Sequence, residues 1–228
     1  MTATEPLRAI NPSLAHEREL ARRRYRAVAG VDEVGRGAWA GPLVAAAVVL
    51  PPVVDARAAR RLLRRLDGVR DSKLLAPARR EELLGAIEAV AAGIGLGAVS
   101  ADELDRLGLG EANREAMRRA VAALPCPADF LLLDAFRLPG HPAPQRAIVR
   151  GDRECLSIAA ASIVAKVTRD RALVALGLDY PAYGFDRHKG YGTPDHQAAL
   201  RHHGPSPQHR QSFAPLRALP PAGPPEME

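Results

Sequence analysis

The chain has 228 residues, of which 47% are hydrophobic and 25% are charged. This composition is typical of globular proteins, and the length suits one α/β domain with a smaller appendage. No apolar run approaches the ~20 residues that a membrane span needs, and the N-terminus begins with polar and acidic residues in place of a signal sequence. We therefore expect a cytoplasmic protein that has no membrane partner.

The formal net charge is +6, and nearly all of the 32 basic residues are arginine. A basic excess favours a polyanionic partner such as nucleic acid, although an arginine-rich genome composition gives the same excess without any function. Against this background the few lysines stand out: Lys73, Lys166 and Lys189. An ammonium is a compact point charge and a guanidinium a planar fork, so we interpret these lysines as candidate site residues. The alternative is that they are chance survivors.

Two residue types exclude other classes of function. Aromatic residues make up only 4% of the chain, too few for a platform on which single-stranded bases stack. The cysteines, Cys126 and Cys155, have no metal-like spacing, and we expect them to be free thiols.

The first half of the chain predicts an N-terminal arm and three strands. Residues 1–25 are expected to form a loose arm with a short, solvated basic helix over 17–25. Short β-branched runs at 27–34 and 43–50 predict two strands, joined by the glycine-rich turn Gly35-Arg36-Gly37 to Gly41-Pro42. Helical spacing follows at 55–66 and 77–91, and a glycine-alternating strand at 94–99.

The second half predicts helices that alternate with two more strands. The helices are expected from a capping box at Ser100 to Glu103, and then over 111–124, 157–176 and 195–203. The strands are expected over 130–133, ending in Asp134, and over 147–149. Three successive strands, followed by this alternation, predict an α/β fold: a mixed sheet of about five strands with helices on both sides and a small C-terminal helical part. The proline-rich stretch from Arg217 to the C-terminus is predicted to be a disordered tail.

Four carboxylates stand where apolar strands end: Asp32, Glu33, Asp134 and Asp152. Each has a structural alternative, since Asp134 would suit a turn and Asp152 would suit a turn or a helix N-cap. Taken together, converging acids repel one another unless divalent cations neutralise them, and hard oxygen ligands suit Mg²⁺ or Mn²⁺. A pair of such ions ~4 Å apart is the usual arrangement for phosphodiester hydrolysis.

A long string of residues carries a resemblance to a known family. The segment VDEVGRGAWAGPLVAAAVV, from Val31 to Val49, resembles the signature of the type 2 ribonucleases H, specifically bacterial ribonuclease HII. Further matching motifs follow in order along the chain: Asp71-Ser72-Lys73, the strand ending in Asp134, Gly151-Asp152, the segment from Ser157 to Arg171, His188-Lys189-Gly190-Tyr191, and His209 to Phe213. The resemblance runs from about Arg26 to Phe213, and all three lysines fall inside its motifs.

The resemblance implies a ribonuclease H-like fold and an endonuclease. Such an enzyme hydrolyses the RNA strand of RNA/DNA hybrids and cuts 5′ of ribonucleotides embedded in duplex DNA, leaving a 3′-hydroxyl and a 5′-phosphate. The implied domain organisation is an arm over 1–25, a catalytic domain over 26–216 and a tail over 217–228. We expect a monomer whose partners are hybrids and ribonucleotide-containing duplexes.

The resemblance also assigns roles to residues. Asp32, Glu33, Asp134 and Asp152 are the implied catalytic carboxylates and ligands of two Mn²⁺ or Mg²⁺ ions, with Asp32 bridging. The Gly35-Arg36-Gly37 turn would sense the ribose 2′-hydroxyl, and Tyr191 would contact the sugar at the RNA–DNA junction. The implied phosphate contacts are Arg36, Lys73, Lys166 and Lys189. Supporting roles behind these residues are expected for Asp170, His188 and Arg210.

Two rival functions remain open on the residues alone. A non-catalytic nucleic-acid-binding module gains nothing from acids that face phosphates. Another nuclease of the same fold, such as a junction resolvase or an exonuclease, explains the acids but leaves the glycine-rich turn and the HKGY motif unexplained.

Overall fold

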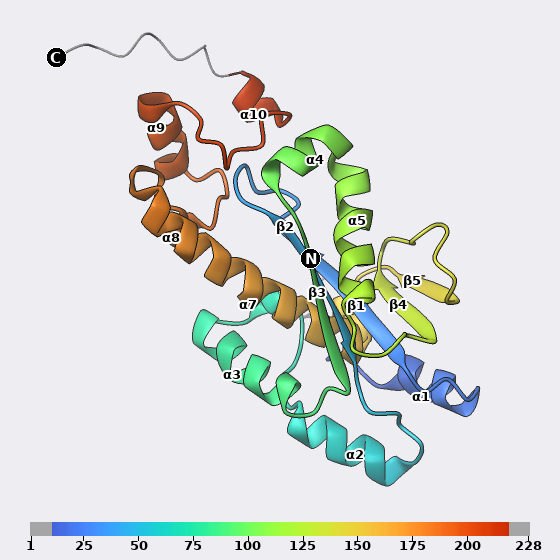
Figure 1. Ribbon diagram of the computed structural model, residues 1–228. Coiled ribbons are helices and arrows are strands. Elements are labelled where there is room, and N and C mark those ends of the chain that lie inside the picture. The colour runs from blue at the N-terminus through green and yellow to red at the C-terminus, as the bar shows by residue number, and fades with distance from the viewer. Residues whose placement is uncertain (1–10, 219–228) are drawn as a thin grey trace, which may run out of the picture.

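The computed structural model describes residues 11–218, which form ten α-helices, two short 3₁₀ helices and five strands (Figure 1). The strands are β1 Val28–Val34, β2 Leu43–Val49, β3 Gly93–Val99, β4 Phe130–Asp134 and β5 Gln145–Ile148. The helices are α1 Ala15–Arg22, α2 Ala56–Arg65, η1 Ser72–Leu74, α3 Pro77–Glu88, α4 Ala101–Leu107, α5 Leu109–Ala122, α6 Gly151–Glu154, α7 Leu156–Asp179, η2 Pro181–Tyr183, α8 Phe185–His188, α9 Pro194–His203 and α10 Ala214–Arg217. Among these helices, none is long and apolar enough to cross a bilayer.

The strands form one mixed sheet in the order β3-β2-β1-β4-β5. The first three strands pair antiparallel, whereas β4 and β5 run parallel to β1 and to each other. The first strand in the sequence, β1, is therefore the central strand of the sheet. The C-terminal ends of β1 and β4 lie side by side at one edge of the sheet, which is where acidic residues end both strands.

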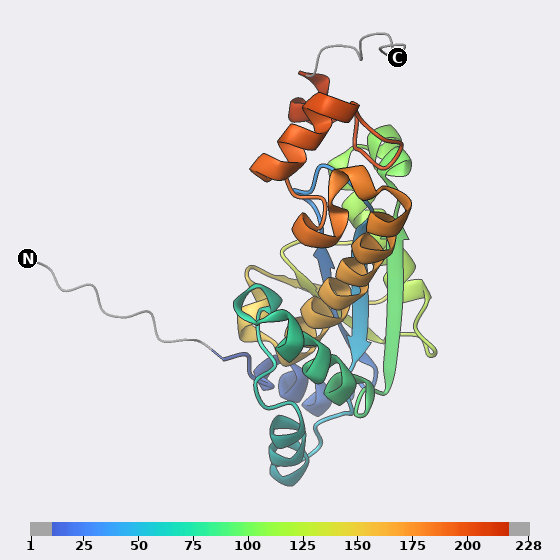
Figure 2. The same cartoon turned by 90° about the vertical axis from the view of Figure 1, so that its left-hand side faces the viewer.

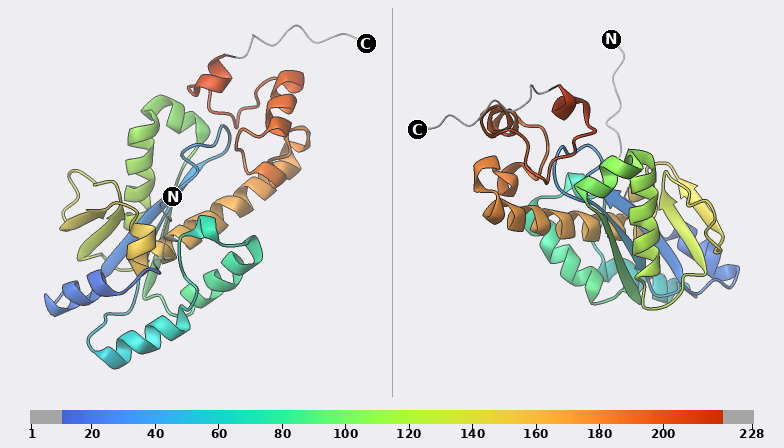
Figure 3. Two further views of the ribbon diagram at one scale, coloured as in Figure 1. Left: turned by 180° about the vertical axis from the view of Figure 1, so that it is seen from behind. Right: turned by 45° about the horizontal axis from the view of Figure 1, so that its top comes forward.

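Helices cover both faces of this sheet, as the sequence predicts. On one face, α5 packs against β2 and β3; on the other, α7 crosses β1 and β2 with α2 and α3 outside it (Figures 1 and 3). Gly30 of β1 permits this crossing, because a Cβ there would lie 2.2 Å from the backbone carbon of Ser157 in α7. The alanine-rich half of α7 is buried for the same reason: small side chains let the helix lie close to the strands.

The helix α1 belongs to the folded body, so the prediction of a solvated helix is wrong. Glu17 and Leu20 are buried, and the Glu17 carboxylate accepts a hydrogen bond from the backbone N–H of Ser157 at 2.9 Å. The segment before α1 also pairs with the joint between α6 and α7, through Ser13. This contact holds the C-terminal end of α6, the short helix that carries Asp152.

The C-terminal helices gather at one end of α7, and α2 lies at the opposite end of the molecule (Figures 1 and 2). Trp39, Leu173, Phe185, Leu200 and Leu216 contribute to a small core there, so this part packs on the β1–β2 connection as well as on α7. Arg217 ends α10, so a disordered tail beginning at residue 217 is wrong at that residue. The rest of the predicted tail, from residue 219 on, and the first ten residues of the predicted arm lie outside the described residues.

Candidate active site

Three of the four predicted carboxylates converge at the ends of β1 and β4. Asp32, Asp134 and Asp152 each offer a ligand oxygen, and these oxygens lie within 4.8 Å of one another. Asp32 and Asp152 are buried, and Asp134 is partly buried. The site therefore concentrates three acids in a volume that a hard divalent cation fits.

Backbone N–H groups hold two of the three carboxylates in place. Asp32 accepts a hydrogen bond from the Glu33 N–H at 2.8 Å, and Asp134 accepts one from the Gly151 N–H at 2.8 Å. The residue at the N-cap of α7 is Cys155, so the alternative that Asp152 caps that helix is wrong. Asp134 does stand at a turn, but its carboxylate belongs to the cluster as well.

Two residues next to the cluster adopt the left-handed backbone conformation, which is unfavourable for any residue other than glycine. Ala135, directly after Asp134, has φ 56°, and Arg150, two residues before Asp152, has φ 57°. Strained conformations persist only where the surrounding structure imposes them, and they are common at functional sites. The geometry at the acids is thus imposed by the fold.

The surroundings raise the pKa of each of the three clustered carboxylates. Burial, and then the charges of Glu33 and Asp134, raise the pKa of Asp32 well above its ordinary value. Burial followed by the charges of Asp71 and Asp134 raises the pKa of Asp152 to about 6, and burial also raises the pKa of Asp134. The protein therefore carries repulsion here that an external cation would relieve.

Glu33 lies beside this group and is held differently. Its side chain is buried and pairs with Arg36 at 3.7 Å, and its Oε2 atom has no hydrogen-bond partner among the described residues. Burial raises the pKa of Glu33 to about 7, against the opposing charge of Arg36. The structure thus brings three predicted ligands together and places Glu33 next to them, on the other face of the strand.

Lys73 is the lysine nearest to the acids. Burial lowers its pKa, but the charges of Asp71, Asp32, Asp152 and Asp134 outweigh this effect and raise it. Asp71, which we did not single out from the sequence, is buried, accepts a hydrogen bond from the Lys73 N–H at 3.0 Å and pairs with Arg153 at 3.3 Å. It therefore fixes the short helix η1 beside the cluster.

The Gly35-Arg36-Gly37 turn is held from beneath by two buried arginines. Arg210 donates to the carbonyl oxygens of Gly35 at 2.6 Å and Gly41 at 2.9 Å. Arg169 lies under Gly35, which has φ 94° and whose added Cβ would lie 2.3 Å from the arginine Nε. At Gly37 an added Cβ would meet nothing within 4 Å. Neither packing nor a positive φ requires glycine at position 37.

The predicted Arg210 thus has a defined role in supporting the turn, whereas Arg169 was missed. Both guanidiniums are fully buried, and their partners are carbonyl oxygens. Burial lowers the pKa of Arg210 to about 9. Burying an arginine costs free energy unless its N–H donors are satisfied. Here the carbonyl oxygens of the β1–β2 connection accept from both arginines, which holds that connection in place.

The remaining predicted contacts lie along α7 from its middle onward and in the segment that follows it. A surface groove of about 450 Å³ is lined by Lys166, Lys189, Asp170 and three arginines. Lys166 pairs with Asp170 at 2.7 Å. The Tyr191 ring is 36% exposed, and the Lys166 ammonium lies 5.9 Å from its centroid. Lys166 and Lys189 therefore line one basic groove, and Tyr191 lies beside Lys166.

His188 is partly buried and packs against a second histidine. Its ring stacks on His196 at 4.3 Å, and its Nδ1 accepts a hydrogen bond from the Gly190 N–H at 3.2 Å. His196 and His209 are fully or almost fully buried beside it, and neither was assigned a role from the sequence. His209 opens one of the matching motifs, whereas His196 has only the excess of histidine after residue 187 as a sequence signal.

The donor set fits a divalent cation of the Mg²⁺ or Mn²⁺ type. All the converging ligand atoms are carboxylate oxygens, which such ions prefer, and neither histidine nor cysteine belongs to the cluster. The raised pKa values and the unpartnered Glu33 oxygen show that the described residues leave the negative charge partly uncompensated.

Comparison with known proteins gives a consistent result. The family model described as Ribonuclease HII matches residues 29–216. A curated protein from Roseiflexus castenholzii, named Ribonuclease HII, is 53% identical over 211 residues, which is 92% of each chain.

Solved structures share the fold. The crystal structure of the ribonuclease H2 from Pyrococcus horikoshii is 28% identical, has a TM-score of 0.68, and the match covers 83% of this chain and 95% of that one. Bst-RNase HIII in complex with Mn²⁺ is 18% identical with a TM-score of 0.59, covering 95% of this chain and 75% of that one, and this likeness concerns the fold alone. The predicted α/β fold with a mixed sheet of five strands is confirmed.

Proposed function

Because this chain belongs to the ribonuclease HII family, we propose that it cuts duplex DNA on the 5′ side of an embedded ribonucleotide, using two divalent ions. The family makes the protein a ribonuclease H, an endonuclease that acts on RNA/DNA hybrids. The proposal adds the single ribonucleotide as a substrate, the ions and the roles of individual residues.

The convergence of Asp32, Asp134 and Asp152 within 4.8 Å carries the proposal. These three residues, with Glu33 beside them, would hold Mg²⁺ or Mn²⁺, and Mn²⁺ is the ion named for Bst-RNase HIII. When bound, such ions activate a water molecule and stabilise the leaving 3′ oxygen. Asp32 would be a ligand at the centre of the group, because it is buried and the charges of Glu33, Asp134 and Asp152 all act on it.

The products follow from which bond breaks. Water attacks the phosphorus, and the bond to the 3′ oxygen of the upstream nucleotide is cleaved. That nucleotide keeps a 3′-hydroxyl, and the ribonucleotide keeps a 5′-phosphate. The backbone hydrogen bonds to Asp32 and Asp134 hold these carboxylates in place, so they would meet a bound ion without rearranging.

The glycine-rich turn is the proposed sensor of the ribose. Gly37 is open and is required neither for packing nor for a positive φ, so a nucleotide that lies against the backbone is a reason for glycine there. Arg210 and Arg169 hold the turn rigid, which lets its backbone groups discriminate a 2′-hydroxyl from a hydrogen. Tyr191, partly exposed, would contact the sugar at the junction.

The basic residues are the proposed phosphate contacts. Lys73 lies among the acids, and Lys166 and Lys189 line the groove. Arg36 pairs with Glu33 and stacks on Phe136 at 4.4 Å, which leaves it at the turn beside the acids. Asp170 has a supporting role because it pairs with both Lys166 and Arg80.

A cleavage assay on matched duplexes tests the proposal. One duplex carries a single ribonucleotide, a second is all DNA, and a third is a long RNA/DNA hybrid. We expect a cut on the 5′ side of the ribonucleotide with Mg²⁺ or Mn²⁺, no cut after chelation, and no cut in all-DNA duplex. Cleavage of the hybrid with none at the single ribonucleotide would refute the proposed substrate and leave the family assignment intact.

Tyr191→Ala separates junction recognition from general binding. The variant should lose about tenfold or more activity on the single ribonucleotide and much less on the hybrid, because only the junction requires one sugar to be placed against the ring. Equal losses on both substrates would remove Tyr191 from junction recognition. His202→Phe, an exposed change on α9, is the matched control for surface effects.

A further inference from the structure

A chain of hydrogen bonds through two buried histidines ends on the backbone of Tyr191. His209 Nδ1 accepts from the Ser206 N–H at 2.9 Å, and the two Nε2 atoms of His209 and His196 lie 2.9 Å apart. His196 Nδ1 lies 3.0 Å from the carbonyl oxygen of Tyr191. His196 is 0% and His209 2% exposed.

The partners at the two ends decide where the protons lie. The Tyr191 carbonyl oxygen only accepts, so the His196 proton is on Nδ1 and the bare Nε2 of His196 accepts the proton on Nε2 of His209. Nδ1 of His209 is then bare and accepts from the Ser206 N–H at 2.9 Å and the Ser206 hydroxyl at 2.8 Å, while the Ser206 carbonyl oxygen is more distant at 3.3 Å. Every nitrogen of both rings then has a compatible partner, and both rings are neutral.

The surroundings support neutral rings. Burial lowers the pKa of His196 and of His209 to about 4. The titratable groups that face them are His188, stacked on His196, and Tyr183, whose ring centroid lies 5.0 Å from that of His209. Phe185 meets the His196 ring edge to face at 5.7 Å. An added proton on either ring would break one link of the chain.

The same short segment also holds the glycine-rich turn. Arg210, the neighbour of His209, donates to Gly35, and its own N–H donates to the Trp39 carbonyl at 2.8 Å. His209 forms an antiparallel bridge with Ala40. His209 is thus linked to Tyr191 through His196, and its neighbour Arg210 is linked to the glycine-rich turn through its guanidinium. Tyr191 and the turn are the two elements of the proposed sugar site.

We propose that His196 and His209 are positioning residues that fix Tyr191 in register with the Gly35–Gly37 turn. The inference rests on the proposed function, in which the ring and the turn contact the same sugar. Without the His196 bond the Tyr191 carbonyl keeps, among the described residues, the Thr193 N–H at 2.8 Å. Tyr191 then loses its link to His209 and is tied to Arg210 by the backbone alone, because the Gly190 carbonyl accepts from the Trp39 N–H at 2.8 Å.

Nitrogen-15 NMR of the histidines in the full chain tests the hydrogen-bond chain without any substrate. We expect a proton on Nε2 of His209 and on Nδ1 of His196 at neutral pH. The opposite tautomers, or a charged ring at neutral pH, would overturn the proposal. His196→Phe should shift the Tyr191 ring resonances, whereas His202→Phe should not. Unchanged Tyr191 resonances in His196→Phe would also overturn it.

A double-mutant cycle tests the effect on substrate choice. His196→Phe should lose about tenfold activity at the single ribonucleotide and much less on the hybrid, and it should add nothing when Tyr191 is already alanine. His196→Asn, whose amide N–H lies near the place of Nδ1, should retain most of the selectivity and serves as the second variant if His196→Phe unfolds.

The outcomes separate the two proposals. A loss at the single ribonucleotide that persists in the Tyr191→Ala background, or equal loss on both substrates, would overturn the positioning role. If the parent protein does not cut at a single ribonucleotide, the proposed substrate fails, and the NMR experiments still decide the link between the histidines and Tyr191.

Discussion

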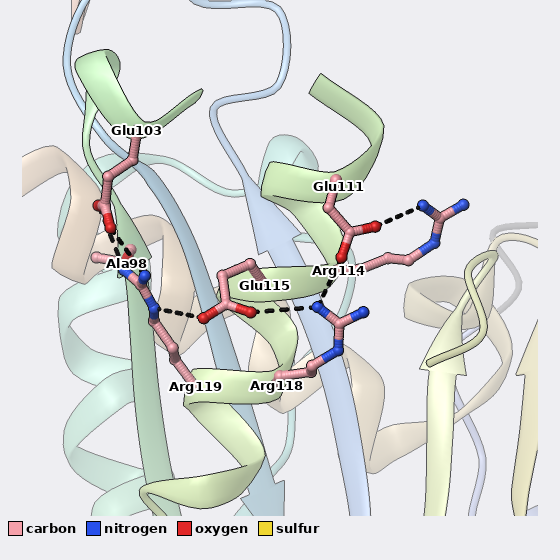
Figure 4. Close-up of polar contacts among 7 residues, drawn as sticks. All are labelled: Ala98, Glu103, Glu111, Arg114, Glu115, Arg118 and Arg119. Atoms are coloured by element: carbon pink, nitrogen blue, oxygen red, sulfur yellow. Dashed lines mark hydrogen bonds and ion pairs between the residues drawn. The ribbon is translucent and has the colours of Figure 1, made fainter. Parts of the chain in front are cut away.

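On the face covered by α5, Glu103, Glu111 and Glu115 lie among arginines, whereas at the strand ends Asp32, Asp134 and Asp152 lie among one another. Figure 4 shows the first group: Arg119 bridges Glu103 and Glu115, and Arg118 bridges Glu115 and Glu111. Arg119 also donates to the Ala98 carbonyl of β3 at 2.7 Å.

The pKa values move in opposite directions in the two groups. Hydrogen bonds from Arg119 lower the pKa of Glu103 to about 2, and those from Arg118 lower the pKa of Glu111. At the strand ends, by contrast, burial raises the pKa of Asp152 to about 6. The chain has ample arginine and pairs it with these surface acids, whereas among the described residues no ion pair involves Asp32, Asp134 or Asp152. This difference indicates that the missing compensation is left for a ligand.

Asp134→Asn has the largest expected effect, because it removes one acid from the uncompensated group. Cleavage should fall to background, since a neutral amide is a poor ligand for a hard cation. The metal-free protein should become more stable by on the order of 1–2 kcal/mol at pH 8, because one repelling charge is gone. The asparagine oxygen still accepts the Gly151 N–H. Kinetics and urea unfolding measure both effects, and activity lost through unfolding would contradict the account.

The pH dependence of stability should also differ between the two groups. An acid whose pKa is higher in the folded state stabilises the fold below the unfolded pKa, near 4, and loses this contribution as the pH rises through the folded value, about 6 for Asp152 and about 7 for Glu33. Without metal, the wild-type protein should therefore lose stability relative to Asp134→Asn between pH 5 and pH 8.

The comparison with the variant is needed because other groups titrate nearby. His196 and His209 have lowered pKa values, so their contribution is complete above about 6.5 and is lost as the pH falls towards about 4. This change has the opposite sign and is common to both proteins. Parallel stability curves for the two proteins would show that the acids do not repel as described.

Arg119→Ala has the smallest expected effect. The pairs it breaks are largely exposed, and exposed ion pairs contribute between about 0 and 1 kcal/mol. Unfolding in urea should shift by no more than that, and cleavage should not change. A large loss of activity would show that the arginine network supports the site, and the contrast between the two groups would fail.

The sequence predicted most of the elements of the fold, because hydrophobic period and turn residues mark them locally. The bounds of the strands were expected within one residue, apart from β5, which begins two residues earlier than expected, at Gln145 and not at Ala147. The helix α6 was not expected: four residues have no detectable period, and the preceding Arg150 adopts a left-handed conformation that favours glycine.

The site was predicted less evenly. Asp32, Asp134 and Asp152 could be found because an acid at the end of an apolar strand is anomalous in any sequence. Asp71 and Arg169 fall inside matching motifs, but their roles could not be predicted, because they depend on partners far away in the chain. The partners of Arg169 are carbonyl oxygens, which no sequence pattern marks. The roles of His196 and His209 could not be predicted either, because they depend on which ring nitrogens carry protons, and only the folded arrangement decides that.

The central claim is that the strand-end acids are left uncompensated for a divalent ion, and thermal unfolding during titration with Mn²⁺ tests it most directly. The wild-type protein and Arg119→Ala should both become more stable as Mn²⁺ rises, by about 2.7 kcal/mol at a hundredfold excess over the dissociation constant. Asp134→Asn should begin more stable and gain little. An equal gain in all three proteins, or no gain in the wild type, would contradict the claim.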